Sequence, residues 1–199
     1  MPKQPMRAFV IAMECEAECV RPWLREGDRL YVSDIGKVNA AAATQKAIDD
    51  GATEIFNAGV AGGFGDGISA GDVFEISRAV EYDFDLSLVN GTGVGIHDER
   101  KTPYFQFVTT GRFPSKTLGT GDRFRDDTAD FPLLRSLGVE VRDMEGAAIA
   151  HVAEKYGVPC RSVKCITNVV GGGAVDQYHG NMEMSLARLS AALKEILVG

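Results

Sequence analysis

The stretch that decides the fold is VRDMEGAAIAHVAEKYGVPCRSVKCITN, residues 141–168. An apolar run ends in the acids Asp143 and Glu145, and a helix-forming stretch rich in small residues follows them. A second apolar run then ends in the amide of Asn168. This strand–helix–strand order is typical of α/β proteins, in which ligands bind beyond the carboxyl ends of the strands. The polar ends of both strands are therefore predicted to face one crevice.

The same alternation continues along the rest of the chain. Apolar or alternating runs predict further strands at 7–13, 29–35, 53–58, 72–80, 104–110, 115–119 and 161–167. Helices are predicted at 14–25, 38–50, 145–156 and 182–198. Residues 59–67 are expected to form a glycine-rich turn, and residues 86–102 a loop. The chain is thus predicted to be α/β, with a mostly parallel sheet covered by helices on both faces.

Composition sets the broad class of protein. The 199 residues (1–199) fit a single domain, and the net charge of −7 argues against a nucleic-acid or anionic-membrane partner. No run is long enough for a signal segment or a membrane span, so a cytoplasmic protein is expected. Four cysteines with the spacings CxxxC and CxxxxC have no histidine nearby. We expect them to be reduced thiols and not metal ligands.

An acidic cluster follows the first predicted strand. Residues 12–18 read AMECEAE, with three carboxylates at a strand-to-helix turn. Acids in the first turn of a helix are favoured by its dipole, so all three could simply be solvated. The alternative interpretation is that one of them turns inward and acts as a general base.

Three glycine-containing segments could approach a ligand: 34–40 (DIGKVNA), 57–63 (NAGVAGG) and 119–124 (GTGDRF). The first is not a P-loop, because the position of its upstream glycine is Tyr31. The second has no GxGxxG before a helix, so it is a weak candidate for a dinucleotide site and could equally be a tight turn. The third, taken alone, indicates only a loop.

Taken together, these motifs resemble the purine nucleosidases of the nucleoside phosphorylase superfamily, in particular the methylthioadenosine/adenosylhomocysteine nucleosidases. The resemblance implies a three-layer α/β/α fold around a central mixed, mostly parallel twisted sheet. It assigns activation of the attacking water to Glu16 and binding of the ribose to Met144 and Glu145. The other substrate contacts that it implies are the pocket for the 5′ substituent (Ile35), the backbone along the sugar and base (Val60, Ala61, Gly62), the stacking ring (Phe124) and the backbone that reads the purine edge (Arg125).

Asn168 departs from the methylthioadenosine enzymes, which have an aspartate at this position. A protonated aspartic acid can give a proton to purine N7, whereas an amide offers one donor and one acceptor but is no general acid. Its NH₂ group could donate to a 6-oxo group while its oxygen holds the developing N7–H. Asparagine here resembles the branches of the superfamily specific for 6-oxopurines, including futalosine hydrolase. An amide can flip, so adenine stays open as the base.

We therefore predict a hydrolase that releases a purine base from a 5′-modified nucleoside, with Glu16, Glu145 and Asn168 as the catalytic residues. A phosphorylase is disfavoured because acids replace a phosphate cradle at the first turn. A non-catalytic nucleoside sensor stays open because the general acid is missing. No cofactor and no metal are expected, since the family has a pair like Asp83 and Asp85 and uses no metal. A homodimer is the family's usual assembly. His97 and His151 are expected to have surface or packing roles, and His179 to lie in a flexible stretch.

Overall fold

Buried apolar runs form a single mixed sheet in the computed structural model, which describes residues 5–169 and 173–198. The strands are β1 (Arg7–Ile11), β2 (Arg29–Val32), β3 (Glu54–Gly63), β4 (Val73–Glu81), β5 (Tyr104–Gln106), β6 (Ser115–Thr120), β7 (Val141–Asp143) and β8 (Cys160–Val169). The helices are α1 (Glu14–Val20), η1 (Arg21–Trp23), α2 (Lys37–Asp49), α3 (Ser87–Asn90), α4 (Phe131–Ser136), α5 (Gly146–Lys155) and α6 (Ala174–Val198). Within the described residues, no helix is both long and apolar enough to cross a bilayer.

The strand order is β2-β1-β3-β7-β6-β4-β5, and β8 pairs with both β3 and β4. The long central pairings, such as β3 with β8 and β4 with β6, are parallel. Because β8 joins β3 to β4, the strands β3, β7, β6, β4 and β8 form a closed circuit of pairings. The predicted mixed, mostly parallel sheet is confirmed.

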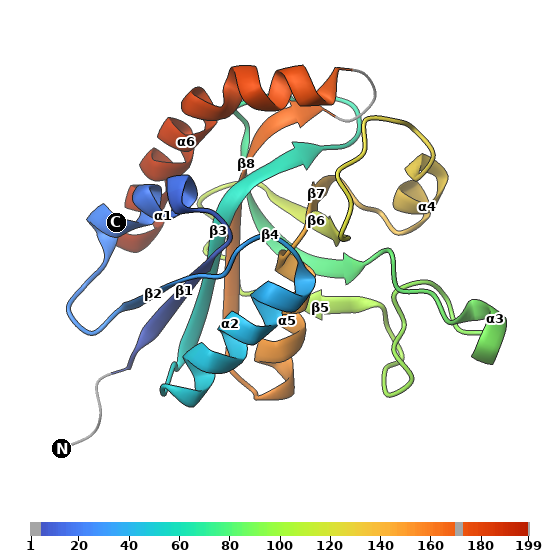
Figure 1. Cartoon of the computed structure of the whole chain (residues 1–199), viewed down its shortest axis with the longest axis horizontal. Helices are drawn as coiled ribbons and strands as arrows, with labels where there is room; N and C mark the ends of the chain where they lie inside the picture. Colours follow the sequence, from blue (N-terminus) through green and yellow to red (C-terminus); the bar gives the residue numbers. More distant parts are fainter. Residues whose placement is uncertain (1–4, 170–172, 199) are drawn as a thin grey trace.

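Helices cover both faces of the sheet, which gives the three predicted layers (Figure 1). On one face, alanines of α2 and α5 pack into a buried cluster with Val10, Ile55 and Ile166. On the other face, apolar residues of α1 and α6 pack on Phe9 and Phe56. Both clusters are close to fully buried, so each apolar stripe read in the sequence has a sheet face to cover.

Two segments differ from the prediction. Residues 59–63 are not a turn but the second half of β3, because β8 and β7 pair with them from either side. Helix α6 begins at Ala174 and not at Met182, so His179 is helical. The Ala174 N–H donates to Asp126 Oδ1 (2.9 Å), which satisfies one free donor at the start of the helix. The flexible stretch was predicted at 171–181, and its residues 171 and 172 lie outside the described residues.

Smaller differences between the prediction and the structure concern two short helices and the end of one strand. The short helices α3 and α4 were not predicted, and the strand expected at 104–110 ends at Gln106.

The pairing of β3 with β8 contains a register shift. Ala61 pairs with Ile166 and Gly62 with Asn168, so Thr167 is an extra residue in β8. Such a bulge interrupts the alternation of side chains between the two faces of a strand.

Candidate active site

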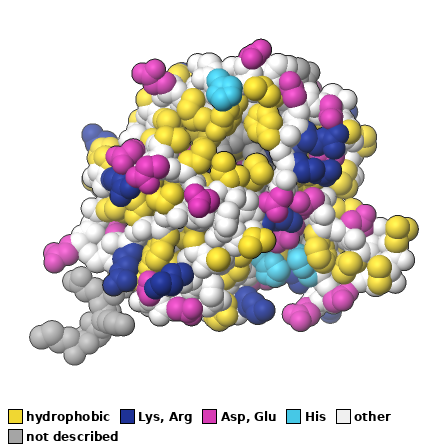
Figure 2. All heavy atoms as spheres, viewed as in Figure 1, with side chains coloured by type: hydrophobic (Ala, Val, Ile, Leu, Met, Phe, Trp, Pro, Cys, Tyr) yellow, Lys and Arg dark blue, Asp and Glu magenta, His cyan; other side chains and the backbone are white. Residues whose placement is uncertain are grey.

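A cavity of about 410 Å³ lies at the carboxyl ends of β1, β3, β7 and β8. Figure 2 shows a hollow bordered by hydrophobic side chains on this face of the molecule. Every residue that the sequence assigns to the site lines this cavity: Glu16, Asn168, Glu145, Met144, Phe124, Arg125, Val60, Ala61, Gly62 and Ile35. The predicted convergence of the two polar strand ends is therefore confirmed, while the chemical role of each residue stays a prediction.

Glu16 is the inward-facing acid of the first turn, since only 3% of it is exposed whereas Glu14 and Glu18 are exposed. Its Oε1 accepts a hydrogen bond from the Val60 N–H (2.8 Å) and its Oε2 from the Met13 N–H (3.1 Å). Burial raises the pKa of Glu16, although the charge of Lys164 opposes this shift. Both oxygens are thus oriented by backbone donors, and the carboxylate is more basic than one in water.

Gly59 allows this placement of Glu16. A Cβ at position 59 would lie 2.6 Å from Glu16 Oε1, closer than Cβ atoms approach other atoms. The absence of a side chain therefore lets the carboxylate lie against β3 and accept the Val60 N–H. The glycine-rich stretch supplies close approach within a strand, and not the predicted turn.

A fully buried lysine, which was not predicted from the sequence, contacts the lining of the cavity through Asp143. Lys164 Nζ is 2.8 Å from Asp143 Oδ2, and each of these side chains is only 2% exposed. Burial alone would lower the pKa of Lys164, but Asp143, Glu145 and Glu16 outweigh it and raise the pKa. A lysine between the apolar residues Val163 and Cys165 of β8 was the available signal, because lysine is almost never buried without a partner.

Both carboxylate oxygens of Asp143 are held by partners within the protein. Its Oδ1 accepts from Thr120 Oγ1 (2.6 Å), and its Oδ2 accepts from the Gly146 N–H (2.9 Å) as well as facing Lys164. A structural role in holding Lys164 follows more directly from this geometry than contact with a ligand.

Glu145 precedes α5 and faces the cavity from the end of β7. Its Oε1 accepts a hydrogen bond from the Gly36 N–H (2.9 Å), which joins it to the segment before α2. Burial, followed by repulsion from Asp143, raises the pKa of Glu145 to about 7. Its carboxyl group is therefore poised to exchange a proton near neutral pH, and in its ionised form it can accept from ligand hydroxyls.

Asn168 is buried, and its amide is held by the preceding residue. Thr167 Oγ1 lies 2.9 Å from Asn168 Oδ1 and 3.3 Å from the carbonyl oxygen of Ala61. A hydroxyl has one proton, so it can donate to only one of these acceptors at a time. Because Thr167 is the extra residue of the bulge, consecutive side chains here reach the same cavity. When the Thr167 hydroxyl donates to Asn168 Oδ1, it orients the amide and so influences which end of it faces a ligand.

An aromatic pair borders the cavity opposite the carboxylates. The rings of Phe124 and Tyr178 meet edge to face, with centroids 5.8 Å apart, and Tyr178 Oη reaches Met13 Sδ at 3.7 Å. Phe124 is half exposed, as a ring free to stack on a planar ligand would be. The side chain of Arg125 pairs with Asp127 (2.6 Å), which leaves its backbone for a ligand. Tyr178 was missed because the stretch before residue 182 was not predicted as helix.

Known proteins match this chain over most of its length. A family model described as the Phosphorylase superfamily matches residues 23–198. A 5′-methylthioadenosine/S-adenosylhomocysteine nucleosidase of Marinomonas sp. is 28% identical over 185 residues, which cover 85% of this chain and 80% of that protein. An aminodeoxyfutalosine nucleosidase of Campylobacter jejuni is 28% identical over 155 residues, covering 71% and 68%.

The fold has a close counterpart among solved structures. The native structure of futalosine hydrolase from Helicobacter pylori superposes with a TM-score of 0.87, at 20% identity and over 96% of each chain. At this identity the likeness concerns the fold alone, and it agrees with the fold that the sequence motifs implied.

Proposed function

This chain belongs to the phosphorylase superfamily, and from that premise we propose that it is a purine nucleosidase that hydrolyses the N-glycosidic bond of a 5′-modified purine nucleoside. The observation that carries this proposal is the convergence of Glu16, Glu145 and Asn168 on one cavity. Its volume, about 410 Å³, suits a nucleoside-sized ligand. The nucleosidase names of the similar proteins agree with this proposal.

The reaction needs a nucleophile and a site for developing positive charge. Glu16, oriented by two backbone N–H groups, would take a proton from water as the water oxygen bonds to the anomeric carbon. The C–N bond breaks in the same step, and its electron pair leaves on the base, which takes a proton from solvent water. General base catalysis of this kind contributes about 10²–10⁴ in rate. Glu145 would accept hydrogen bonds from the ribose hydroxyls, and its negative charge would stabilise the oxocarbenium-like transition state. Met144 and Ile35 would pack on the sugar and on the 5′ substituent.

The leaving base would lie between Phe124 and Asn168. With Thr167 donating to Asn168 Oδ1, as the shorter distance favours, the Nδ2 group is the end free for a ligand acceptor. A 6-oxopurine presents that acceptor at O6, whereas adenine presents a donor. We therefore propose that a 6-oxopurine nucleoside, such as futalosine, is the preferred substrate.

A phosphorylase is less consistent with the charges of the site. Glu16, Asp143 and Glu145 share the buried cation Lys164, so a phosphate dianion placed beside the carboxylate of Glu16 would be repelled by it. A nucleoside sensor is the second candidate, and the specific observation in its favour is the amide at Asn168, which cannot protonate a leaving base.

Release of free base, measured by chromatography without phosphate, tests the function. The panel holds inosine, futalosine, methylthioadenosine and adenosylhomocysteine, with Glu16→Gln as the matched control. Hypoxanthine release that falls about 10²–10⁴-fold in Glu16→Gln is the expected result. A strict requirement for phosphate would replace the hydrolase with a phosphorylase, and nucleoside binding without turnover would replace it with a sensor.

We also propose that the protein is a homodimer whose interface includes the rim of the cavity. Ile35, which lines the cavity, is 49% exposed, and Val38, which lines an adjoining hollow, is 79% exposed. Apolar side chains next to a ligand site are typical of surfaces that a partner covers. Sedimentation at equilibrium should give a dimer that Val38→Glu weakens, and a monomeric wild type would contradict the proposal.

A further inference from the structure

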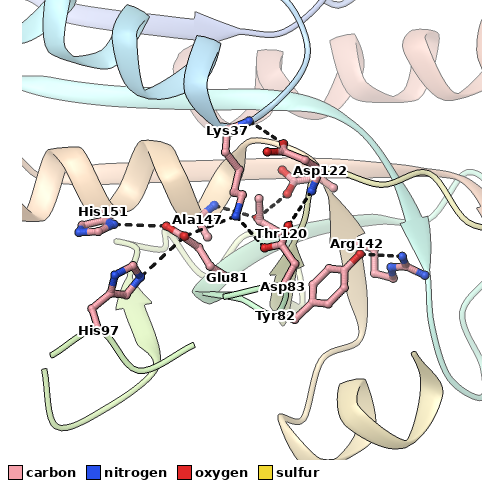
Figure 3. A network of polar contacts seen from close by, with 11 residues as sticks. Lys37, Glu81, Tyr82, Asp83, His97, Thr120, Asp122, Arg142, Ala147 and His151 are labelled. Carbon is pink, nitrogen blue, oxygen red and sulfur yellow. Dashed lines mark hydrogen bonds and ion pairs between the residues drawn. The ribbon is translucent and has the colours of Figure 1, made fainter. Parts of the chain in front are cut away.

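Two histidines and a glutamate meet at a place away from the cavity (Figure 3). Glu81 ends β4, His151 lies in α5, and His97 lies in the segment between α3 and β5. Glu81 Oε1 is 3.2 Å from His151 Nδ1, and Glu81 Oε2 is 3.7 Å from His97 Nε2. One ligand atom from each residue lies within 4.8 Å of the others. None of the three side chains lines the candidate active site.

We propose that Glu81, His97 and His151 bind a divalent transition-metal ion, with Zn²⁺ as the best fit. Two imidazoles and one carboxylate are the donor set that such ions prefer, and three protein ligands leave a fourth position for water. Around zinc at about 2.0–2.1 Å, neighbouring ligand atoms of a tetrahedron are about 3.3–3.4 Å apart. The two histidine nitrogens lie 3.2 Å and 3.7 Å from the two oxygens of the Glu81 carboxylate, and the three ligand atoms lie within 4.8 Å of one another, so side-chain movements would have to close this group around an ion.

His97 supplies the strongest independent support. Its Nε2 atom is shielded from solvent and makes no hydrogen bond within the described residues, which is costly for a buried polar atom. Its ring is stacked on Phe84, with centroids 3.9 Å apart, so this nitrogen is held facing Glu81 and His151.

The neighbouring charges are compatible with a bound cation. Lys37 Nζ lies 3.6 Å from Glu81 Oε2 but 2.7 Å from Asp83 Oδ1, so Asp83 holds the ammonium group and Glu81 keeps its charge for an ion. The guanidinium of Arg100 is engaged by Glu154 and by the Tyr104 carbonyl oxygen. Lys37 balances one of the two carboxylates Glu81 and Asp83, so this group of side chains keeps a net negative charge.

A metal here would fasten the segment between α3 and β5 to α5. Rings already prepare this contact, because Phe105 stacks on His151 at 4.5 Å and meets His97 edge to face at 5.9 Å. His151 is the most accessible ligand, with 36% of its side chain exposed, which gives an ion a route in. The site would therefore stabilise this side of the sheet.

Zinc binding to the full chain tests the proposal. The parent for the series is Cys15→Ser, which removes the one exposed thiol and leaves three buried cysteines. Titration against a chromophoric chelator should give one bound Zn²⁺ per chain. His97→Gln and His151→Gln should each weaken binding at least tenfold. His179→Gln, the matched control, alters the remaining histidine and should bind as the parent does.

A second measurement does not depend on whether the variants fold. X-ray absorption of the zinc-loaded, unsubstituted chain should show two imidazoles and no sulfur in the first coordination shell. Zinc should also raise the melting temperature of the parent but not of the two histidine variants. Absence of stoichiometric binding, equal affinity in His97→Gln and the parent, or sulfur ligation would each overturn the proposal.

Discussion

Replacing Lys164 by methionine is the sharpest test of the buried charges. Methionine keeps most of the volume of the lysine stem, so the change removes a charge with little change in packing. Lys164 faces Asp143 at 2.8 Å, and both side chains are only 2% exposed. In Lys164→Met, three acids that share one buried region lose their cation, and we expect the folded protein to take up one further proton there.

The cost of this change can be bounded in two ways. At 2.8 Å and an effective dielectric constant of about 20, the Lys164–Asp143 attraction is worth about 6 kcal/mol. Protonating one carboxyl group is a cheaper alternative, at about 1.4 kcal/mol for each pH unit above its unfolded pKa of about 4. The expected loss in the free energy of unfolding is therefore about 4 kcal/mol at pH 7 and about 1.5 kcal/mol at pH 5. The loss grows with pH because the extra carboxyl group has a higher pKa in the folded variant than in the unfolded chain. Protonation of this group therefore favours the folded state fully below pH ~4, and that contribution is lost as the pH rises.

Urea denaturation at pH 5, 6 and 7 measures this trend. The matched control is Lys116→Met, because Lys116 pairs with Glu140 at 2.6 Å while both side chains are partly exposed. Such a pair contributes about 0–1 kcal/mol, and the control should show little pH trend. A loss in Lys164→Met that is equal at pH 5 and pH 7, or below about 1 kcal/mol at pH 7, would refute the reasoning.

Three further predictions concern the acids and the amide of the cavity. Gly59→Ala should reduce kcat about 10²-fold, because the new Cβ displaces the Glu16 carboxylate. The control Gly93→Ala places its Cβ at an ordinary contact distance and should leave kcat unchanged. An equal kcat in Gly59→Ala and the wild type would contradict the close packing of Glu16 on Gly59. Burial raises the pKa of Glu145 to about 7 in the folded protein, above its ordinary value of 4.5. The resulting contribution to the free energy of unfolding is fully present below pH ~4.5 and is lost as the pH rises to about 7. The difference in free energy of unfolding between wild type and Glu145→Gln should therefore change by about 3 kcal/mol over that range in urea titrations, and a constant difference would show that Glu145 does not titrate there. Asn168→Asp should shift base release from hypoxanthine towards adenine in a competition assay, and an unchanged ratio would mean that this side chain does not read the base.

The fold could be predicted from sequence because its signals are local. The buried strands are apolar runs, and their carboxyl ends meet at one edge whatever the details of the turns. The extent of β3 could not be read in this way. Glycines at 59, 62 and 63 have low strand propensity, and only the neighbouring strands on both sides keep them extended. The early start of α6 likewise depends on a tertiary contact, from its first N–H to Asp126.

The residues that line the cavity could be predicted where they belong to a recognisable motif at the end of a strand. Glu16, Glu145 and Asn168 are residues of this kind. Lys164 was missed because its partners are brought together only by the sheet. The same reason hid the pairing of His97 with His151, since segments far apart in the sequence meet on Glu81. Charge and ligand clusters assembled across several strands carry no short sequence pattern.

The extra residue in β8 makes the end of the cavity where we propose that the base binds depend on chain length as well as on residue identity. Among the described residues, only Asn168 and Val169 pair with β3 beyond the register shift, so gaining or losing one residue at Thr167 would disturb these pairs at the end of the strand. Deletion of Thr167 would remove the hydroxyl that contacts the Asn168 amide, and an insertion beside it would displace that hydroxyl, while the amide itself is kept. Insertion and deletion therefore offer an evolutionary route to altered base preference that substitution at position 168 does not provide.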